Sequence, residues 1–138
     1  SQSYNSSIRT LFKNAPNIEA GIKYSVSETN IGSLETKYFT ESPFVELDAL
    51  ILKSFTFRTN YSTTKFKDQN TLLNNYKFFD ASLSYRTDKE SKWEFEIKAT
   101  NLLDTKSQSQ SSVSNISVST SEYFIQPRFI TLRLIYTL

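Results

Sequence analysis

The sequence predicts an all-β fold, and two observations carry this prediction: apolar residues recur at every second position, and the composition favours strands. The chain of 138 residues contains 8 Tyr, 11 Phe and 1 Trp, but only 2 Gly and 3 Pro. Aromatic and β-branched residues pack well on a pleated strand surface. This length corresponds to one ordinary domain-sized unit.

The segments that alternate between apolar and polar residues are residues 18–26, 55–62, 79–85, 92–100 and 130–138. Successive side chains of a strand point to opposite faces, so each segment has one apolar face and one polar face. A helix would instead need apolar residues three and four positions apart. Two weaker segments, residues 4–12 and 45–51, bring the expectation to about seven antiparallel strands.

The connections between these segments are expected to alternate in length. Residues 13–17, 52–54 and 88–91 are short connections, and the longer ones are residues 29–43, 67–75 and 104–121. A transmembrane barrel has short turns on the periplasmic side and longer loops outside. The pattern therefore predicts an antiparallel meander that forms part of a transmembrane β-barrel. Residues 104–121 are rich in Ser, and we expect them to form a mobile external loop.

The expected strand number also bears on the size of the barrel. With the C-terminus on the periplasmic side, about seven strands place the start of the chain outside. A complete bacterial barrel usually has an even strand number. We therefore expect residues 1–138 to belong to a larger barrel.

The residue types that are missing narrow the possible functions. The chain has no Cys, His or Met, so thiolate metal sites, imidazole bases and Cys nucleophiles are excluded. The net charge of +2 and the dispersed basic residues argue against nucleic acid. Glu94 and Glu96 share a strand face, but Lys92 and Lys98 flank them and no cleft is implied. We expect no enzyme activity, no catalytic residue, no metal ligand and no cofactor.

The apolar faces have two interpretations. In a transmembrane barrel they point at lipid, whereas in a soluble sandwich or lipid-binding barrel they point into a core. We favour the first interpretation, and the residues expected to face lipid are Phe55, Phe57, Leu83, Tyr85, Trp93, Phe95 and Ile97. The residues expected to form interfacial girdles near strand ends are Tyr24, Tyr61, Tyr85, Trp93 and Tyr136.

The polar faces carry the charged residues Lys23, Arg58, Arg86, Glu94, Glu96, Lys98 and Arg133. We expect these side chains to pair across neighbouring strands, because pairs of opposite charge support a sheet. A direct contact with a transported substrate is the less favoured reading for any one of them.

Two short elements resemble a known family. Asn101, Leu102, Leu103 and Asp104 follow an amphipathic strand and resemble the Asn-Leu-Leu-Asn/Asp element of TonB-dependent receptors. Pro127 and Arg128 stand at the start of a final strand that is similar to the last strand of this family. That strand also resembles the assembly signal of outer-membrane proteins, through Ile130, Leu132, Leu134, Tyr136 and Leu138. The family usually ends in Phe or Trp, where this chain has Leu138.

The resemblance implies the C-terminal β-barrel portion of a TonB-dependent outer-membrane receptor of the Bacteroidetes-type superfamily, a multi-pass protein of the bacterial outer membrane. Such a receptor has a barrel of about 22 strands, with a plug and a TonB-binding segment upstream of Ser1. The implied partners are outer-membrane lipid, the barrel assembly machinery, TonB through the upstream segment, and a surface lipoprotein. The implied function is nutrient import. Two alternatives stay open: a scaffolding subunit of a larger outer-membrane assembly, and a soluble lipid-binding β-barrel.

Overall fold

The computed structural model describes residues 1–13, 16–31, 34–88, 90–113 and 118–137. The elements of this part of the chain are the strands β1 (Gln2–Arg9), β2 (Asn17–Ile31), β3 (Leu34–Ile51), β4 (Phe55–Asp68), β5 (Thr71–Tyr85), β6 (Trp93–Thr100), β7 (Ser107–Val113), β8 (Val118–Phe124) and β9 (Phe129–Tyr136). In the described ranges, no helix is long and apolar enough to cross a membrane.

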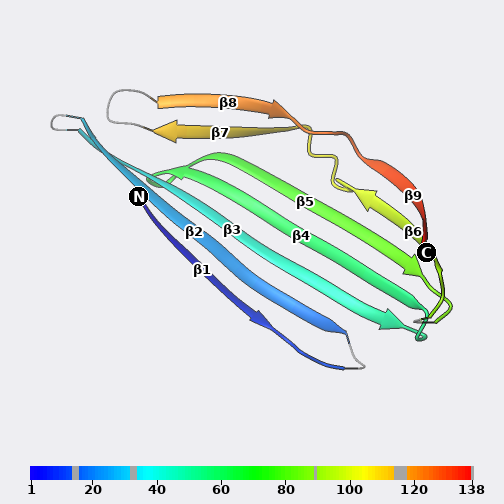
Figure 1. The fold of residues 1–138 in the computed structure, drawn as a ribbon. Coiled ribbons are helices and arrows are strands. Elements are labelled where there is room, and N and C mark those ends of the chain that lie inside the picture. The colour runs from blue at the N-terminus through cyan, green and yellow to red at the C-terminus, as the bar shows by residue number, and fades with distance from the viewer. Residues whose placement is uncertain (14–15, 32–33, 89, 114–117, 138) are drawn as a thin grey trace.

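Seven strands form one open, curved sheet in the order β1-β2-β3-β4-β5-β6-β9, and each pairs antiparallel with its neighbours (Figure 1). The strands β7 and β8 form a separate hairpin between β6 and β9. The predicted all-β antiparallel meander is thus confirmed. An open sheet of this kind is compatible with a segment of a barrel and with one layer of a sandwich.

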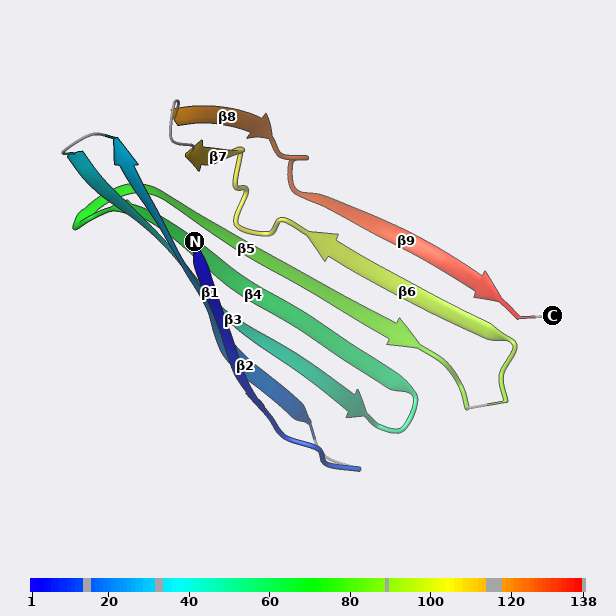
Figure 2. The ribbon, with the colours of Figure 1, turned by 60° about the vertical axis from the view of Figure 1, so that its left-hand side comes forward.

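Two predicted loops are largely strand, which corrects the sequence analysis. Residues 29–43 were expected to form a long connection, but the β2–β3 ladder continues to the pair formed by Ile31 and Leu34. Residues 67–75 likewise form the ends of β4 and β5. Figure 2 shows how far these two hairpins extend. Ladder hydrogen bonds join backbone groups, so a strand can continue where the apolar alternation has ended.

Most of the predicted external loop, residues 104–121, lies within the β7–β8 hairpin. Its register runs from Ser107 opposite Phe124 to Val113 opposite Val118. A Ser- and Gln-rich segment lacks the apolar alternation that reveals a strand, so the sequence did not indicate this hairpin. The expected mobility of residues 104–121 stays a prediction.

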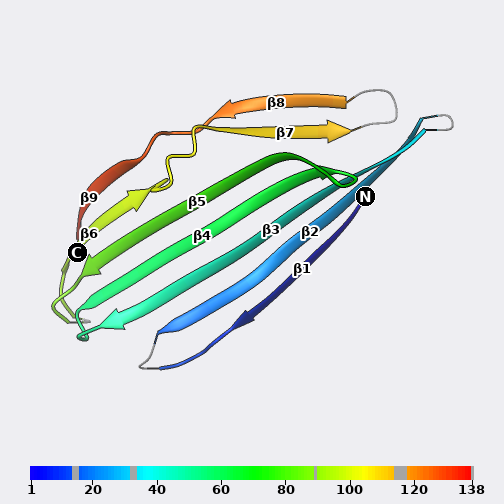
Figure 3. The same ribbon diagram turned by 180° about the vertical axis from the view of Figure 1, so that it is seen from behind.

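The connections at one end of the sheet are the β1–β2, β3–β4 and β5–β6 turns, and the C-terminus lies at that end (Figure 3). The β3–β4 turn is the tightest of them, and both Leu52 and Lys53 have positive φ, of 52° and 61°. Three residues separate the paired residues Ile51 and Phe55, and hairpin loops usually place Asn or Gly at positions of positive φ. The N-terminus and the β7–β8 hairpin lie toward the opposite end.

The register sorts the side chains of the sheet onto two different faces. Leu83 lies between Phe57 of β4 and Ile97 of β6, and Ile97 in turn lies opposite Leu132 of β9. Residues directly opposite each other in an antiparallel ladder share a face. The apolar residues of consecutive strands therefore form one continuous apolar face, and the intervening polar residues form the other face.

Neither face is covered by a second layer in the described part of the chain. The buried apolar side chains there are Ala49 and Tyr76, which are 7% and 6% exposed. On the apolar face, Trp93 and Phe95 are 48% and 53% exposed, and Leu132 is 78% exposed. A large exposed apolar surface marks contact with another apolar medium or partner. The sheet is therefore held together by its strand ladders, without a conventional core.

Gly21 allows a close approach between β1, β2 and β3. A Cβ atom at this position would lie 2.6 Å from the backbone oxygen of Ser6, and 2.7 Å from both Cζ of Phe44 and Cβ of Ser7. The Phe44 ring, which lies opposite Gly21 in the β2–β3 ladder, occupies the space that a side chain would need. An aromatic ring over a glycine compensates for the packing that the glycine lacks.

We predict that Gly21→Ala lowers the free energy of unfolding by about 1–3 kcal/mol, because the added methyl group overpacks this contact. The measurement is the unfolding midpoint followed by β-sheet circular dichroism. Ser25→Ala, on the same face of β2, is the control and should change the midpoint little. The double variant Gly21→Ala/Phe44→Leu should recover only part of the loss, since the clash with the Ser6 backbone remains. An unchanged midpoint in Gly21→Ala would contradict the role given to this contact.

Candidate functional site

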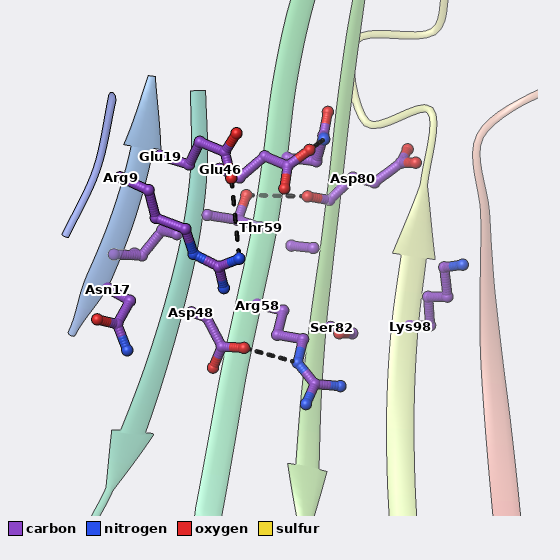
Figure 4. Close-up of a pocket in the computed structure, with 13 residues that line it drawn as sticks. Arg9, Asn17, Glu19, Glu46, Asp48, Arg58, Thr59, Asp80, Ser82 and Lys98 are labelled. Carbon is purple, nitrogen blue, oxygen red and sulfur yellow. Dashed lines mark hydrogen bonds and ion pairs between the residues drawn. The ribbon is translucent and has the colours of Figure 1, made fainter. Parts of the chain in front are cut away.

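The hollow side of the sheet is its polar face, and it contains a groove of about 300 Å³ between β1 and β6 (Figure 4). The charged side chains that line the groove are Arg9, Glu19, Glu46, Asp48, Arg58, Asp80 and Lys98. They come from six neighbouring strands, one or two from each. Because alternate residues of each strand face the groove, the polar residues of the alternating sequence pattern form most of its surface.

Ion pairs between neighbouring strands balance much of this charge. Arg9 Nη1 lies 3.9 Å from Glu19 Oε2, and Arg58 Nε lies 3.2 Å from Asp48 Oδ2. Each pair joins residues that are directly opposite in the ladder. The Arg9 and Arg58 side chains are more than half exposed, so each pair contributes at most about 1 kcal/mol to stability.

The same arrangement continues toward β9. Arg133 Nη2 lies 2.6 Å from Glu96 Oε2 across the β6–β9 ladder. In the groove, Asn60 Nδ2 donates a hydrogen bond of 2.8 Å to Glu46 Oε1. The predicted cross-strand pairing is thus confirmed for Arg58, Arg133 and Glu96.

Two of the charged residues have a different environment from the one predicted. Arg86 Nε donates a hydrogen bond of 3.1 Å to the backbone oxygen of Ser91, so this side chain braces the β5–β6 turn, and among the described residues it forms no ion pair with a neighbouring strand. Lys23 Nζ lies 5.5 Å from the centre of the Phe44 ring. A cation above an aromatic ring is attracted by the electron density of that ring.

The groove offers charge and hydrogen bonding, and its chemistry is that of a hydrated surface. Its hydroxyl groups belong to Ser and Thr, and the chain has no His that could activate them. Among the described residues, no group of three or more His, Cys, Asp or Glu side chains could hold a metal ion. Carboxylates, guanidinium groups and amides in alternation suit contact with water and with polar solutes.

The opposite, apolar face carries a row of aromatic rings near the end of the sheet that contains the β3–β4 and β5–β6 turns. The ring centres of Trp93 and Tyr136 are 4.6 Å apart, and those of Phe55 and Tyr85 are 4.8 Å apart. Phe95 continues the row, 6.5 Å from Tyr85. We name this set of five residues the lower aromatic row. Tyr and Trp side chains suit a border between an apolar and an aqueous medium, because they have an apolar body and a polar tip.

A second row of aromatic rings lies on the same apolar face, toward the opposite end of the strands. The ring centres of Tyr61 and Phe79 are 6.5 Å apart, and those of Tyr24 and Phe39 are 6.3 Å apart. We name these four residues the upper aromatic row. The prediction that Tyr24 and Tyr61 lie near strand ends is wrong, because β2 and β4 both extend well beyond them. The rows lie near the limits of the apolar band rather than at the limits of the strands, and Phe39 lies just beyond Glu41 on β3.

The height of the apolar band can be estimated from the first charged residue on that face. On β2, β3 and β4 these residues are Glu28, Glu41 and Lys65. At the turn end the band begins with Ile18 on β2, Ile51 on β3 and Phe55 on β4. Each charged residue is therefore about ten residues from the start of the band on its own strand, or roughly 34 Å along that strand. At a tilt of about 40° this corresponds to roughly 26 Å, close to the ~25 Å apolar band of transmembrane barrels.

The structure brings the residues that were predicted to face lipid onto this one face. Phe55 pairs with Tyr85, Phe57 with Leu83, and Ile97 with Leu83 on its other side. The terminal-strand residues Ile130, Leu132, Leu134 and Tyr136 lie on the same face, opposite Ala99, Ile97, Phe95 and Trp93. Leu138, the last residue of the predicted assembly signal, lies outside the described residues.

Asn101 has a structural role that the sequence did not reveal. It is 5% exposed and has a φ of 51°, a conformation that Asn tolerates better than most residues. Its Nδ2 donates hydrogen bonds to the backbone oxygens of Thr105, at 2.9 Å, and Gln126, at 3.0 Å. Its Oδ1 accepts a hydrogen bond of 2.9 Å from the Thr105 amide. One side chain thereby joins the chain entering the β7–β8 hairpin to the chain leaving it.

The turn around Asn101 is also fixed to β5. The Asn101 amide donates a hydrogen bond of 2.8 Å to Asp80 Oδ1, and the Leu102 amide donates one of 2.8 Å to the Phe79 backbone oxygen. Leu103 is 47% exposed, and Asp104 has a positive φ of 56°.

The contact with Gln126 brings the two elements of the family resemblance together. Pro127 and Arg128 directly follow Gln126 in the segment that leads from β8 into β9, and both are exposed.

Comparison with known proteins adds no assignment. No protein-family model matches the chain, and no curated protein or solved structure has significant similarity to it. What the chain does must therefore be inferred from its faces, its groove and its turns.

We predict that Asn101→Asp weakens the base of the β7–β8 hairpin by about 1–3 kcal/mol, because the carboxylate cannot donate to the Thr105 and Gln126 oxygens. Asn101→Gly, which retains the backbone conformation, should have a similar effect. The measurement is hydrogen exchange of the β7–β8 amides, which should become faster while exchange in the β2–β3 ladder is unchanged. Gln126→Ala is the control, since Gln126 contributes only its backbone oxygen. Equal exchange rates in the unchanged protein and in the three variants would show that the Asn101 side chain does not hold the base of the hairpin together.

Proposed function

We propose that this chain forms part of the wall of a β-barrel in a bacterial outer membrane, and that the barrel is a nutrient importer of the TonB-dependent type. The observation that carries the membrane placement is the combination of the two faces. A continuous apolar face is exposed between two aromatic rows, and the opposite, hollow face is polar and ion-paired.

The exposed apolar face needs an apolar surrounding. Each square ångström of apolar surface left in water costs about 25 cal/mol relative to burial, and the side chains concerned lie on all seven strands of the sheet. The β7–β8 hairpin pairs with itself and consists mainly of Ser, Gln and Thr, so it is a poor cover for this face. The hydrocarbon of a bilayer would cover it completely.

The direction of curvature favours a transmembrane barrel over a soluble lipid-binding barrel. A lipid-binding barrel encloses its apolar face, because its ligand is apolar. In this sheet the groove is lined by charged and amide side chains instead. A polar interior and an apolar exterior are the arrangement of outer-membrane barrels.

The two ends of the sheet support an orientation. The β3–β4 and β5–β6 turns lie at one end of the sheet, and the β7–β8 hairpin, which pairs apart from the main sheet, lies toward the other end, where the β4–β5 turn has only the residues Gln69 and Asn70 (Figure 3). In outer-membrane barrels the longest connections are external. The hairpin would then lie outside the cell, where an importer meets its ligand.

The importer function rests on the resemblance of residues 101–104, 127–128 and 130–138 to TonB-dependent receptors. Its implied partners, the assembly machinery, TonB through an upstream segment, and a surface lipoprotein, are part of this proposal. The test is binding between the full-length gene product and the periplasmic domain of TonB. Binding supports import, whereas its absence from a correctly inserted barrel would favour a scaffolding subunit.

We predict that Leu132→Arg destabilises the membrane-inserted protein by about 2–4 kcal/mol, because the charge would stand near the middle of the bilayer. The matched control is Ile135→Arg in the same strand. Ile135 lies on the polar face opposite Glu94, so an arginine there gains a carboxylate neighbour. The measurement is the denaturant midpoint of the protein folded into phosphatidylcholine vesicles. Equal losses in the two variants would argue against lipid contact at Leu132.

A further inference from the structure

Two lysines stand on the apolar face immediately beyond the upper aromatic row. In the β4–β5 ladder Thr63 lies opposite Lys77, and Lys65 lies opposite Asn75. Lys65 and Lys77 are therefore diagonal neighbours on one face, and such positions are about 7–8 Å apart. Like charges at this distance repel each other, so the arrangement favours an anion between them.

The nearby carboxylates do not neutralise this pair. Glu41 lies opposite Lys65 in the β3–β4 ladder, but both of its oxygens lie 2.9 Å from Lys67 Nζ. The next acidic residue on this face, Glu28, lies 3.0 Å from Lys37 Nζ. Within the described ranges of the chain, no carboxylate forms an ion pair with Lys65 or Lys77.

The pair also lies at a definite height. Tyr61 and Phe79 of the upper aromatic row lie opposite each other, two ladder positions from the pair of Thr63 and Lys77 on the same face. Lysine stems can lie along such rings while the ammonium groups reach the aqueous border. In the proposed membrane placement this border is the headgroup layer of the external leaflet.

We infer that Lys65, Lys77 and the amide of Asn75 form a binding site for the phosphate group of a lipid headgroup at the external border of the apolar band. The inference rests on the proposed membrane placement. Lysine binds phosphate as a compact point charge with three donors. Two unneutralised ammonium groups and an amide on one exposed face complement a phosphomonoester, whose alkyl chains would lie against the apolar band below.

The test uses the full-length protein in detergent micelles, titrated with short-chain phosphatidic acid or with phosphatidylcholine of the same chains. Native mass spectrometry counts the retained lipids. We expect preferential retention of phosphatidic acid, and we expect Lys65→Gln/Lys77→Gln to lower its affinity about tenfold or more. The matched control is Lys23→Gln/Lys98→Gln, which removes two lysines from the polar face and should retain phosphatidic acid like the unchanged protein.

Several outcomes would overturn the inference. Equal affinity of Lys65→Gln/Lys77→Gln and the unchanged protein would exclude this site, and equal losses in both double variants would show a general effect of net charge. Displacement of the lipid by inorganic phosphate at the same concentration would indicate a site for free phosphate.

A separate measurement distinguishes this inference from the proposed function. Insertion of the unchanged protein into phosphatidylcholine vesicles tests the membrane placement alone. A protein that inserts but shows no preference for phosphatidic acid would contradict only the lysine site. A protein that fails to insert would contradict the membrane placement itself.

Discussion

The backbone ladder between consecutive strands is the constraint on which the rest of this structure depends. The seven-stranded sheet has no second layer over either face in the described part of the chain. Its strands are therefore held by hydrogen bonds and by cross-strand side-chain contacts, and the medium on each side completes the fold. Once the register is set, one face receives every second residue of each strand, and a slip of one residue would exchange the two faces.

The two faces of the sheet differ in chemistry: one carries paired charges and the other carries apolar and aromatic side chains. On the polar side, opposite charges meet directly across the ladder, as Arg58 meets Asp48, so the groove can be hydrated without a large net field. On the apolar side, the rings of Trp93 and Tyr136 border an aliphatic region at one end, and Lys65 stands beyond it at the other. On β4 and β5 these features form a sequence of apolar, aromatic and charged zones, which is the order of environments met on crossing half a bilayer.

The β7–β8 hairpin interrupts the meander without disturbing it. The interruption is possible because the Asn101 side chain bonds to both branches of the chain, and its backbone amide bonds to Asp80 of β5. A buried polar group of this kind is costly unless each of its bonds is made. The arrangement fixes the base of the hairpin to the main sheet through Asn101.

The sequence by itself determined the strand class, the number of strands in the main sheet and the membership of each face, since period-two alternation is a local property. Only the tertiary structure decided how far the strands run, because backbone pairing beyond Val26 needs no apolar residue. The tertiary structure also decided the direction of curvature, so that the polar face is the concave face of the sheet. It likewise decided the hydrogen bond between the Asn101 side chain and the Gln126 backbone oxygen. The diagonal placement of residues distant in the chain, such as Lys65 and Lys77 beyond the aromatic row, follows from register, and register is set by the whole sheet.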